Sequence, residues 1–324
     1  MKVKSSIKEF IYPPKTVTKS CHASTVLPLF DGSVVAAWFG GSEEGNDDVK
    51  IWVSIRKDEK WSEPYSIAVD GKELPHWNPV LFKRENGDII LYFKYGKPIP
   101  NWVTYYCISK DGGKSFSKPQ ILVPGDNDGG RGPVKNKAIR LKDGTVIAPA
   151  SKETILKNWK CFVDISHDDG LTFEHSNFVL RPKKNRKTVG MIQPTLWEQP
   201  EGHIHALMRS NMAYVCESHS TDYGETWSEI VLTDIPNNNS GIDCVLAENG
   251  NIVLVCNPVA QHAGARTPLS VYLSENNGET FCKIFDLETA EGEYSYPSIV
   301  SYGNKVYITY TYKRENIMFC EIEI

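Results

Sequence analysis

Ser109-Lys110-Asp111-Gly112-Gly113-Lys114-Ser115-Phe116 is one copy of an octapeptide that recurs along this chain. The pattern reads Ser-x-Asp/Asn-x-Gly-x-Thr/Ser-aromatic, and further copies span residues 166–173, 220–227 and 274–281. Successive serines lie 57, 54 and 54 residues apart, and a weaker copy at 54–61 begins 55 residues before the first. A period of this length indicates a repeat architecture in which each repeat is one supersecondary unit.

A second series of short motifs keeps step with the first. Asp-Gly, Asn-Gly or a related pair, followed by alternating apolar residues, begins at positions 31, 86, 143, 201, 249 and 303. Such pairs between apolar runs favour β-hairpins, because both residues tolerate positive φ. Six hairpins with room for further strands predict an all-β fold: a six-bladed β-propeller spanning 1–324 as one domain. The run Val3 to Tyr12 is expected to add the outer strand of the last blade and close the ring.

Composition narrows the classes of partner. The formal net charge is −4, so no basic field favours nucleic acid or an anionic membrane. No export signal, bilayer-spanning apolar run, phosphate loop or dinucleotide fingerprint is present, so we expect no membrane partner and no cofactor. The eight cysteines lack C-x-x-C spacing, which favours reduced thiols and a cytoplasmic location. His203 and His205 have no third ligand nearby in sequence, so no metal site is expected.

The inner strands of a propeller begin at one face around the axis, and counting back nine residues from each hairpin turn should locate these starts. The count reaches His22, Trp77, Val134, Ile192, Ser240 and Tyr294, with neighbours Asn78, Lys135, Asn136, Gln193, Asp243 and Tyr296. The loops after the second strands open on the same face and carry Glu43, Glu44, Asp48, Lys94, Lys152, Glu153, Arg209, Asn211, Arg266, Lys313 and Arg314.

The predicted rim combines cations with aromatic rings in a chain that is acidic overall. The cations are Lys94, Lys135, Arg209, Arg266 and Arg314, and the aromatics are Trp77, Tyr294 and Tyr296. A guanidinium offers two parallel N–H donors to a carboxylate, and aromatic faces stack on sugar rings. The expected partner is therefore an oligosaccharide or glycoside with an acidic sugar. The alternative is a solvated rim whose charges pair with one another.

Longer segments make the chain resemble the sialidase superfamily, and more closely its branch of BNR-repeat proteins labelled predicted neuraminidases; the octapeptide resembles that superfamily's Asp-box. The segments are 38–52, 76–80, 135–137, 192–194, 208–210, 238–243 and 292–297. Sialidases hold the substrate carboxylate with three arginines, and use a tyrosine nucleophile activated by a glutamate and an aspartate as acid/base.

The resemblance implies a role for individual positions. Tyr294 matches the nucleophile, Asp48 lies in the loop of the acid/base, and Arg209 and Arg266 match the second and third arginines. His22 stands in place of the first arginine and Gln193 in place of the glutamate. An amide cannot accept the tyrosine's proton as a carboxylate does, so Glu293 or Asp243 is expected to be the base if Tyr294 attacks.

Several roles stay open between two interpretations. Asp48 acts on a ligand or caps its own turn, and His22 transfers protons or is structural. Tyr294 and Tyr296 alternate in sequence, so both are expected on one face of a strand. The leading functional prediction is an exo-acting glycoside hydrolase removing a terminal acidic sugar. The alternatives are a hydrolase or lyase on a uronic-acid glycan, with His22 or Tyr294 abstracting the proton, and a non-catalytic carbohydrate-binding propeller.

Overall fold

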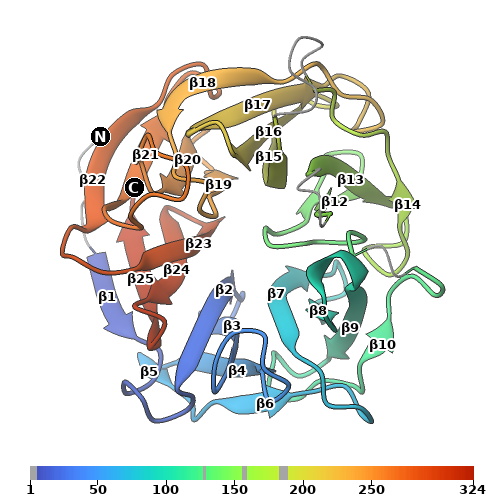
Figure 1. The fold of residues 1–324 in the computed structure, drawn as a ribbon, viewed down its shortest axis with the longest axis vertical. Helices are drawn as coiled ribbons and strands as arrows, with labels where there is room; N and C mark the ends of the chain where they lie inside the picture. Colours follow the sequence, from blue (N-terminus) through green and yellow to red (C-terminus); the bar gives the residue numbers. More distant parts are fainter. Residues whose placement is uncertain (1–5, 127–128, 155–158, 182–188) are drawn as a thin grey trace.

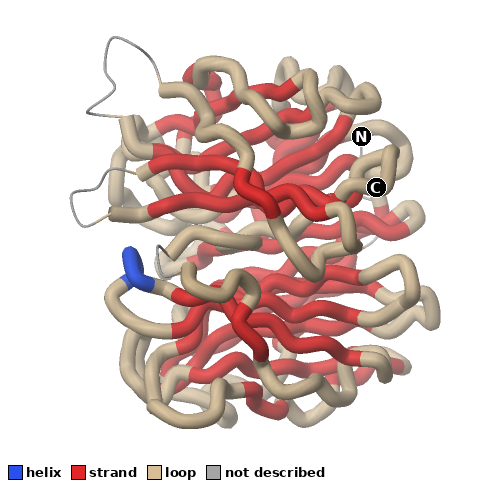
Figure 2. The backbone as a smooth tube through the Cα atoms, turned by 90° about the vertical axis from the view of Figure 1, so that its right-hand side faces the viewer, coloured by secondary structure: helices blue, strands red, loops and turns tan. Residues whose placement is uncertain are grey.

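The computed structural model describes residues 6–126, 129–154, 159–181 and 189–324. Six antiparallel sheets stand around a central axis as blades, with β2, β7, β15, β19 and β23 labelled next to that axis in Figure 1. Figure 2 shows the sheets from the side, with loops gathered at both ends of the strands. The prediction of an all-β, six-bladed propeller is confirmed.

Within each of the first three blades the chain runs through successive antiparallel strands. These are β2 (Ser20–Pro28), β3 (Val34–Gly41), β4 (Lys50–Lys57), β5 (Lys60–Trp61) and β6 (Tyr65–Ile67) in blade 1; β7 (His76–Lys83), β8 (Ile89–Tyr95), β9 (Val103–Ser109) and β10 (Gln120–Ile121) in blade 2; and β11 (Ile139–Arg140), β12 (Val146–Lys152), β13 (Lys160–Ser166) and β14 (Glu174–His175) in blade 3. The described residues include one short 3-10 helix, η1 (Ile99–Asn101), and no helix that is long and apolar enough to cross a membrane.

The other three blades follow the same plan. Their strands are β15 (Met191–Glu198), β16 (Ile204–Ser210), β17 (Tyr214–Ser220) and β18 (Val231–Pro236) in blade 4; β19 (Asp243–Leu246), β20 (Ile252–Cys256), β21 (Leu269–Ser274) and β22 (Cys282–Glu288) in blade 5; and β23 (Tyr294–Tyr302), β24 (Lys305–Tyr312), β25 (Asn316–Glu323) and β1 (Ser6–Phe10) in blade 6.

The N-terminal strand closes the ring, as predicted. β1 pairs antiparallel with β25 from Ser6 opposite Ile322 to Phe10 opposite Met318. The Lys8 ammonium also lies 2.8 Å from Glu288 of blade 5. Residues 3–5 of the predicted run lie outside the described residues. The closure gives β25 a partner on its outer side, where an exposed sheet edge would invite aggregation.

The repeated octapeptide forms a tight turn after the third strand of a blade. In blade 2, Ser109 donates to the Asp111 carboxylate at 2.8 Å, and the Gly113 amide donates to the Ser109 hydroxyl at 2.8 Å. Gly113 has a φ of 87°, and a Cβ atom there would lie 3.0 Å from Val35 of blade 1. Glycine is needed for both the conformation and the close approach, which seats the turn against the neighbouring blade.

Candidate active site

A shared irregularity shapes the inner strands at the axis. The pairing of four inner strands with their neighbours shifts register at one place, between His22 and Thr25, Trp77 and Val80, Ile192 and Thr195, and Ser295 and Ser298. Each shift contains a residue with positive φ, namely Ala23, Asn78, Gln193 and Tyr296. Bulges and positive φ in residues other than glycine re-aim side chains and are concentrated at functional sites.

Tyr296 is the centre of the cluster that these bulges build. Its partly exposed ring lies 4.2 Å from the His22 ring, centroid to centroid. The guanidinium carbons of Arg209 and Arg266 are 5.6 and 5.7 Å from the Tyr296 ring centroid, and the Lys135 ammonium is 5.8 Å away. These groups come from blades 1, 4 and 5 and from the start of blade 3, so the site is assembled around the axis.

Arg209, at the end of β16, is held only by neutral acceptors. It donates from Nε to Asn239 at 2.9 Å, and from Nη1 to the Gln193 amide oxygen at 3.1 Å and the Tyr296 hydroxyl at 2.8 Å. The side chain is 8% exposed. Within the described ranges no carboxylate pairs with Arg209, and no acceptor contacts Nη2. A buried cation with neutral partners is costly without a counter-charge, so this geometry favours an anionic ligand.

The other two arginines of the site share one carboxylate. Arg266 Nη1 and Arg314 Nε lie 2.5 and 2.6 Å from the same oxygen of Glu293. Arg314 also pairs with Glu44 of the 42–49 loop. Burial raises the pKa of Glu293, but the charges and hydrogen bonds of Arg266 and Arg314 lower it by more, so the net shift of the pKa is downward. Glu293 is thus a carboxylate at neutral pH, and it orients both guanidinium groups.

The pKa of His22 is affected by all four cations of the site, which shows that they lie close together. The ring is 2% exposed, and its Nδ1 lies 2.8 Å from the Thr311 hydroxyl oxygen. Burial lowers the pKa of His22 well below its ordinary value, and the charges of Arg314, Arg266, Lys135 and Arg209 lower it further. The imidazole beside Tyr296 is therefore neutral at physiological pH.

Lys135 and Asn136 are buried and connect the start of blade 3 to blades 4, 5 and 6. The Lys135 ammonium donates to the carbonyl oxygens of Ile242, at 3.0 Å, and of Pro297. Asn136 Nδ2 donates to the carbonyls of Gln193 and Pro194, both at 3.0 Å, and so supports the bulge of β15. Burial lowers the pKa of Lys135 to about 7. Blade 3 differs here from the prediction, because its inner strand β11 begins only at Ile139.

The prediction that Tyr294 and Tyr296 share one face is wrong, because the bulge between Ser295 and Ser298 breaks the alternation. Tyr294 is 1% exposed, packs edge-on against Tyr312 at 5.2 Å and belongs to the apolar core shared by blades 5 and 6. Its hydroxyl lies 3.4 Å from the Glu291 carbonyl and interacts with Lys313, whose ammonium is 5.9 Å from the ring centroid. The structure brings Tyr296 into the cluster with Arg209 and leaves Tyr294 outside it.

Asp48 caps its own loop. Its two carboxylate oxygens accept hydrogen bonds from the amide and hydroxyl of Ser42, both at 2.8 Å. The same loop is tied to blade 6 by Glu44 with Arg314, and to the blade 2 loop by Asp47 with Lys97 at 2.7 Å. Of the two interpretations of Asp48, these contacts match the turn cap.

Other predicted site residues are held by structural contacts. Asp243 is fully buried, and its carboxylate lies 3.0 Å from Lys137, 2.6 Å from the Thr195 hydroxyl and 2.9 Å from the Ile299 amide. Trp77 donates from its indole to the Gly96 carbonyl at 3.0 Å and packs on Trp102 at 5.1 Å. Asn78 is buried at the bulge of β7.

The prediction that Lys94 lies on the rim is wrong. The side chain is fully buried, and its ammonium donates to the Thr104 hydroxyl at 2.8 Å and to the Arg131 carbonyl. Burial lowers the pKa of Lys94 to about 7. The lysine is a structural contact between blade 2 and the segment that enters blade 3.

One carboxyl group of the site received no role from the sequence. Glu153 follows β12 of blade 3 and is half-buried. Burial raises its pKa, and the nearby charge of Arg209 opposes this shift. Its loop position was visible in the sequence, but its closeness to Arg209 depends on how blades 3 and 4 pack.

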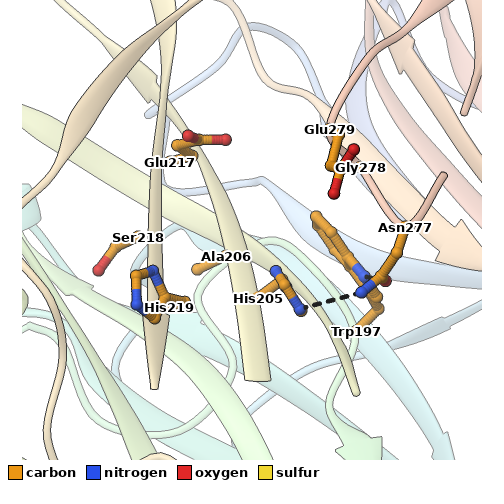
Figure 3. Close-up of a pocket in the computed structure, with 9 residues that line it drawn as sticks. All are labelled: Trp197, His205, Ala206, Glu217, Ser218, His219, Asn277, Gly278 and Glu279. Atoms are coloured by element: carbon orange, nitrogen blue, oxygen red, sulfur yellow. Dashed lines mark hydrogen bonds between the residues drawn. The ribbon is translucent and has the colours of Figure 1, made fainter. Parts of the chain in front are cut away.

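A separate pocket is lined by residues of blades 4 and 5 (Figure 3). There the His205 ring stacks on Trp197 at 4.8 Å, and its Nε2 lies 3.0 Å from the Gln199 carbonyl and 3.4 Å from Asn277 Nδ2. His205 thus joins the two blades. No group of three His, Cys, Asp or Glu side chains in the described residues is placed to hold a metal ion.

Comparisons with known proteins agree on the fold. A family model described as a BNR repeat-like domain matches residues 32–308. A Dyadobacter fermentans protein of unknown function superposes with a TM-score of 0.80 at 17% identity, covering 99% of this chain and 100% of that one. The Hadza microbial sialidase Hz136 gives 0.80 at 16% identity, over 98% of this chain and 68% of the sialidase.

Trypanosoma rangeli sialidase, solved with the inhibitor DANA, gives a TM-score of 0.76 at 16% identity. That match covers 98% of this chain and 60% of the sialidase. A comparison with curated protein sequences gives no significant match. At these identities the structural matches establish the sialidase-like fold, and the chemistry has to be argued from the site itself.

Proposed function

Since this chain belongs to the family of BNR repeat-like domain proteins, we propose that it is an exo-acting glycoside hydrolase that removes a terminal acidic sugar from an oligosaccharide. Sialidases among the structural neighbours support a glycosidase, and the axial site supports an acidic substrate. The single observation that carries the proposal is Arg209, a buried guanidinium bound only by neutral acceptors.

The substrate carboxylate would take the open side of Arg209. Nη2 of Arg209 has no acceptor in the described residues. One of the two hydrogen bonds from Nη1 goes to the uncharged side-chain amide of Gln193. The charged groups of Arg266 and Lys135 also lie within 6 Å of the Tyr296 ring centroid, and they add positive potential to the site. A carboxylate bound at this point would give Arg209 a hydrogen-bonded counter-charge, which no carboxylate among the described residues supplies.

Tyr296 is the group that would face the anomeric carbon. Its hydroxyl oxygen already accepts a hydrogen bond from Arg209, so a negative charge developing on that oxygen would be stabilised by the guanidinium. Tyr296 lies beside Arg209 and Arg266, whereas the cation over the Tyr294 ring is Lys313. The tyrosine role that the family resemblance implied for Tyr294 is therefore assigned to Tyr296.

The proposal is tested with methylumbelliferyl glycosides of N-acetylneuraminic acid and of glucuronic acid, each compared with its methyl ester. The ester keeps the sugar but removes the charge, so we expect fluorophore release from one free acid and little or none from its ester. Equal release from acid and ester would contradict the carboxylate site. Saturable binding of the acids without turnover would instead establish a carbohydrate-binding propeller.

A lyase acting on a uronic-acid glycan is the second candidate, favoured by the neutral His22 ring beside Tyr296. A neutral imidazole can accept a proton from the carbon next to a carboxylate. Elimination would create a conjugated double bond, so absorbance in the near ultraviolet from a uronic-acid oligosaccharide distinguishes it from hydrolysis.

A further inference from the structure

The carboxyl group of Glu153 lies near enough to blade 4 to interact with the charge of Arg209. The hydroxyl of Ser151, two residues earlier in β12, accepts a hydrogen bond of 3.3 Å from the backbone N–H of Gln193. Side chains two residues apart in an extended segment lie on one face. Lys152, between them, lies on the other side, because a Cβ atom at Gly130 would be 2.8 Å from its Cγ. Glu153 directly follows Lys152, the last residue of β12, which places it beside the part of blade 3 that contacts Gln193 and near Arg209.

Glu153 also differs from the other carboxyl groups around the axis. Glu293 binds two arginines, Glu44 binds Arg314, Asp48 binds Ser42, and Asp243 binds Lys137 and Thr195. Across the described ranges, the Glu153 carboxyl makes no hydrogen bond, and its electrostatic partner is Arg209. Glu43 of the 42–49 loop also lacks a side-chain hydrogen bond among the described residues, but of the two carboxyl groups Glu153 is the one that interacts with Arg209.

The environment suits a carboxyl group that carries a proton. Burial raises the pKa of Glu153, and the positive charge of Arg209 offsets only part of that shift. A sugar carboxylate bound to Arg209 would neutralise that opposing charge and raise the pKa further. The protonated form would thus become more populated when substrate is bound, which is what a proton donor needs.

We propose that Glu153 is the general acid of the site, placed to protonate the oxygen of the leaving group. The inference rests on the hydrolase function proposed above. The bond between the anomeric carbon and the leaving oxygen breaks, its electron pair stays on that oxygen, and the Glu153 proton goes to it. The anomeric carbon bonds to the Tyr296 oxygen, whose proton passes to solvent. Water then displaces that oxygen, the proton that this water loses restores the Glu153 carboxyl group, and the tyrosine oxygen takes a proton back from solvent. One glycoside and one water give one free sugar and one alcohol.

A purely structural role makes a different prediction. If Glu153 only balanced the charge of Arg209, its replacement would change the affinity for acidic ligands, and it would slow all leaving groups equally. A general acid matters most when the leaving group is poor, because a good leaving group departs without a proton. The identity of the leaving group therefore separates the two roles.

The experiment compares the wild-type protein with Glu153→Gln, Glu153→Asp and Glu174→Gln. Glu174 lies on the exposed outer strand of the same blade and is the matched control. The substrates are a methylumbelliferyl glycoside and a methyl glycoside of whichever acidic sugar the wild-type protein cleaves. Circular dichroism melting checks that each variant is folded, and Glu153→Asp keeps an acid if the glutamine variant does not fold.

For Glu153→Gln we expect kcat on the methyl glycoside to fall roughly 100-fold or more, with a much smaller loss on the aryl glycoside. The loss of activity at high pH, which comes from deprotonation of the acid, should disappear in this variant. Glu153→Asp should recover part of the lost rate, and Glu174→Gln should match the wild type. Equal losses on both substrates, or none on either, would overturn the assignment.

A second measurement does not need turnover. Calorimetric titration with the free sugar acid, in two buffers of different ionisation enthalpy, reports the protons taken up on binding. We expect proton uptake by the wild-type protein and a smaller uptake by Glu153→Gln, in which Lys135, with a pKa of about 7, can still gain a proton beside the bound anion. Equal uptake by both would overturn the placement of Glu153. Binding without any wild-type turnover would refute the hydrolase function instead, so the two failures are distinguishable.

Discussion

Arg209 donates a hydrogen bond of 2.8 Å to the hydroxyl oxygen of Tyr296, joining the end of β16 in blade 4 to the bulge of β23 in blade 6. The two residues are 87 positions apart in sequence. The contact exists because the bulge gives Tyr296 a φ of 53° and turns its side chain towards the axis. Tyr294, two residues earlier, has ordinary strand geometry and joins the core.

The two tyrosines provide a matched pair of variants. Tyr296→Phe removes the oxygen that Arg209 contacts, and we expect kcat on an acidic aryl glycoside to fall roughly 100-fold or more, as for other groups acting in the transition state. Tyr294→Phe removes a weak contact with the Glu291 carbonyl and the interaction with Lys313, both away from Arg209, so it should lower stability by roughly 1 kcal/mol and leave kcat within about twofold. A larger loss in Tyr294→Phe than in Tyr296→Phe would reverse the assignment.

Arg209→Ala should weaken binding of a free sugar acid by about 1.5–3 kcal/mol, roughly 10- to 150-fold, because a charge-assisted hydrogen bond is lost. Arg209→Lys keeps the charge without the planar fork and should fall in between. Arg140→Ala is the control, since Arg140 pairs with Asp169 in a turn at the opposite end of blade 3. Isothermal titration measures all three, and unchanged affinity in Arg209→Ala would refute the carboxylate site.

Gln193→Glu should place a carboxylate where the amide oxygen now lies 3.1 Å from Arg209. The new ion pair competes with the ligand, so we expect the sugar acid to bind about 1.5 kcal/mol, or roughly tenfold, more weakly. The effect should shrink as the pH falls and the new carboxyl group is protonated. Tighter binding in this variant would mean that the sugar carboxylate is held elsewhere.

The repeated turns predict how stability responds to acid. Burial raises the pKa of Asp111, but hydrogen bonds from Ser115 and Ser109 lower it to about 2. A carboxyl whose pKa is lowered by folding stabilises the fold above its unfolded value, near 3.9, and loses that contribution as the pH falls towards 2. The blade 5 turn makes similar bonds with Asn276 in place of aspartate.

Asp111→Asn should therefore fold and show a smaller loss of stability between about pH 5 and pH 2 than the wild type. The difference should not exceed about 1 kcal/mol, since the carboxylate is exposed. Urea denaturation at several pH values measures it. A variant with the same acid dependence as the wild type would show that Asp111 contributes nothing to it.

The fold was predictable because its signals are local. Each Asp-Gly or Ser-x-Asp turn acts within a few residues, and six repetitions in step leave few alternatives to a propeller. Even the closing strand could be predicted, because a blade with three strands needs a fourth.

The site was predictable only in part, because one bulge decides which side chain reaches the axis. Counting a fixed number of residues back from each turn aligned Tyr294 with His22, whereas the paired strands align Tyr296 with Ala23. The sequence held a usable signal in Asn78-Pro79, Gln193-Pro194 and Tyr296-Pro297, since proline cannot donate to a strand ladder. The closeness of Glu153 to Arg209 had no such signal, because it depends on the packing of two blades.

The pairing of β1 with β25 has a consequence for how the molecule is made. Five blades are each built from one continuous stretch, but blade 6 joins residues 6–10 to residues 294–323. During synthesis β1 stays unpaired until residues 318–322 have left the ribosome. The ring is therefore closed by one strand pair, β1 with β25, which forms last and joins residues far apart in sequence. We expect slow closure, and exchange of strands between molecules, at this pair.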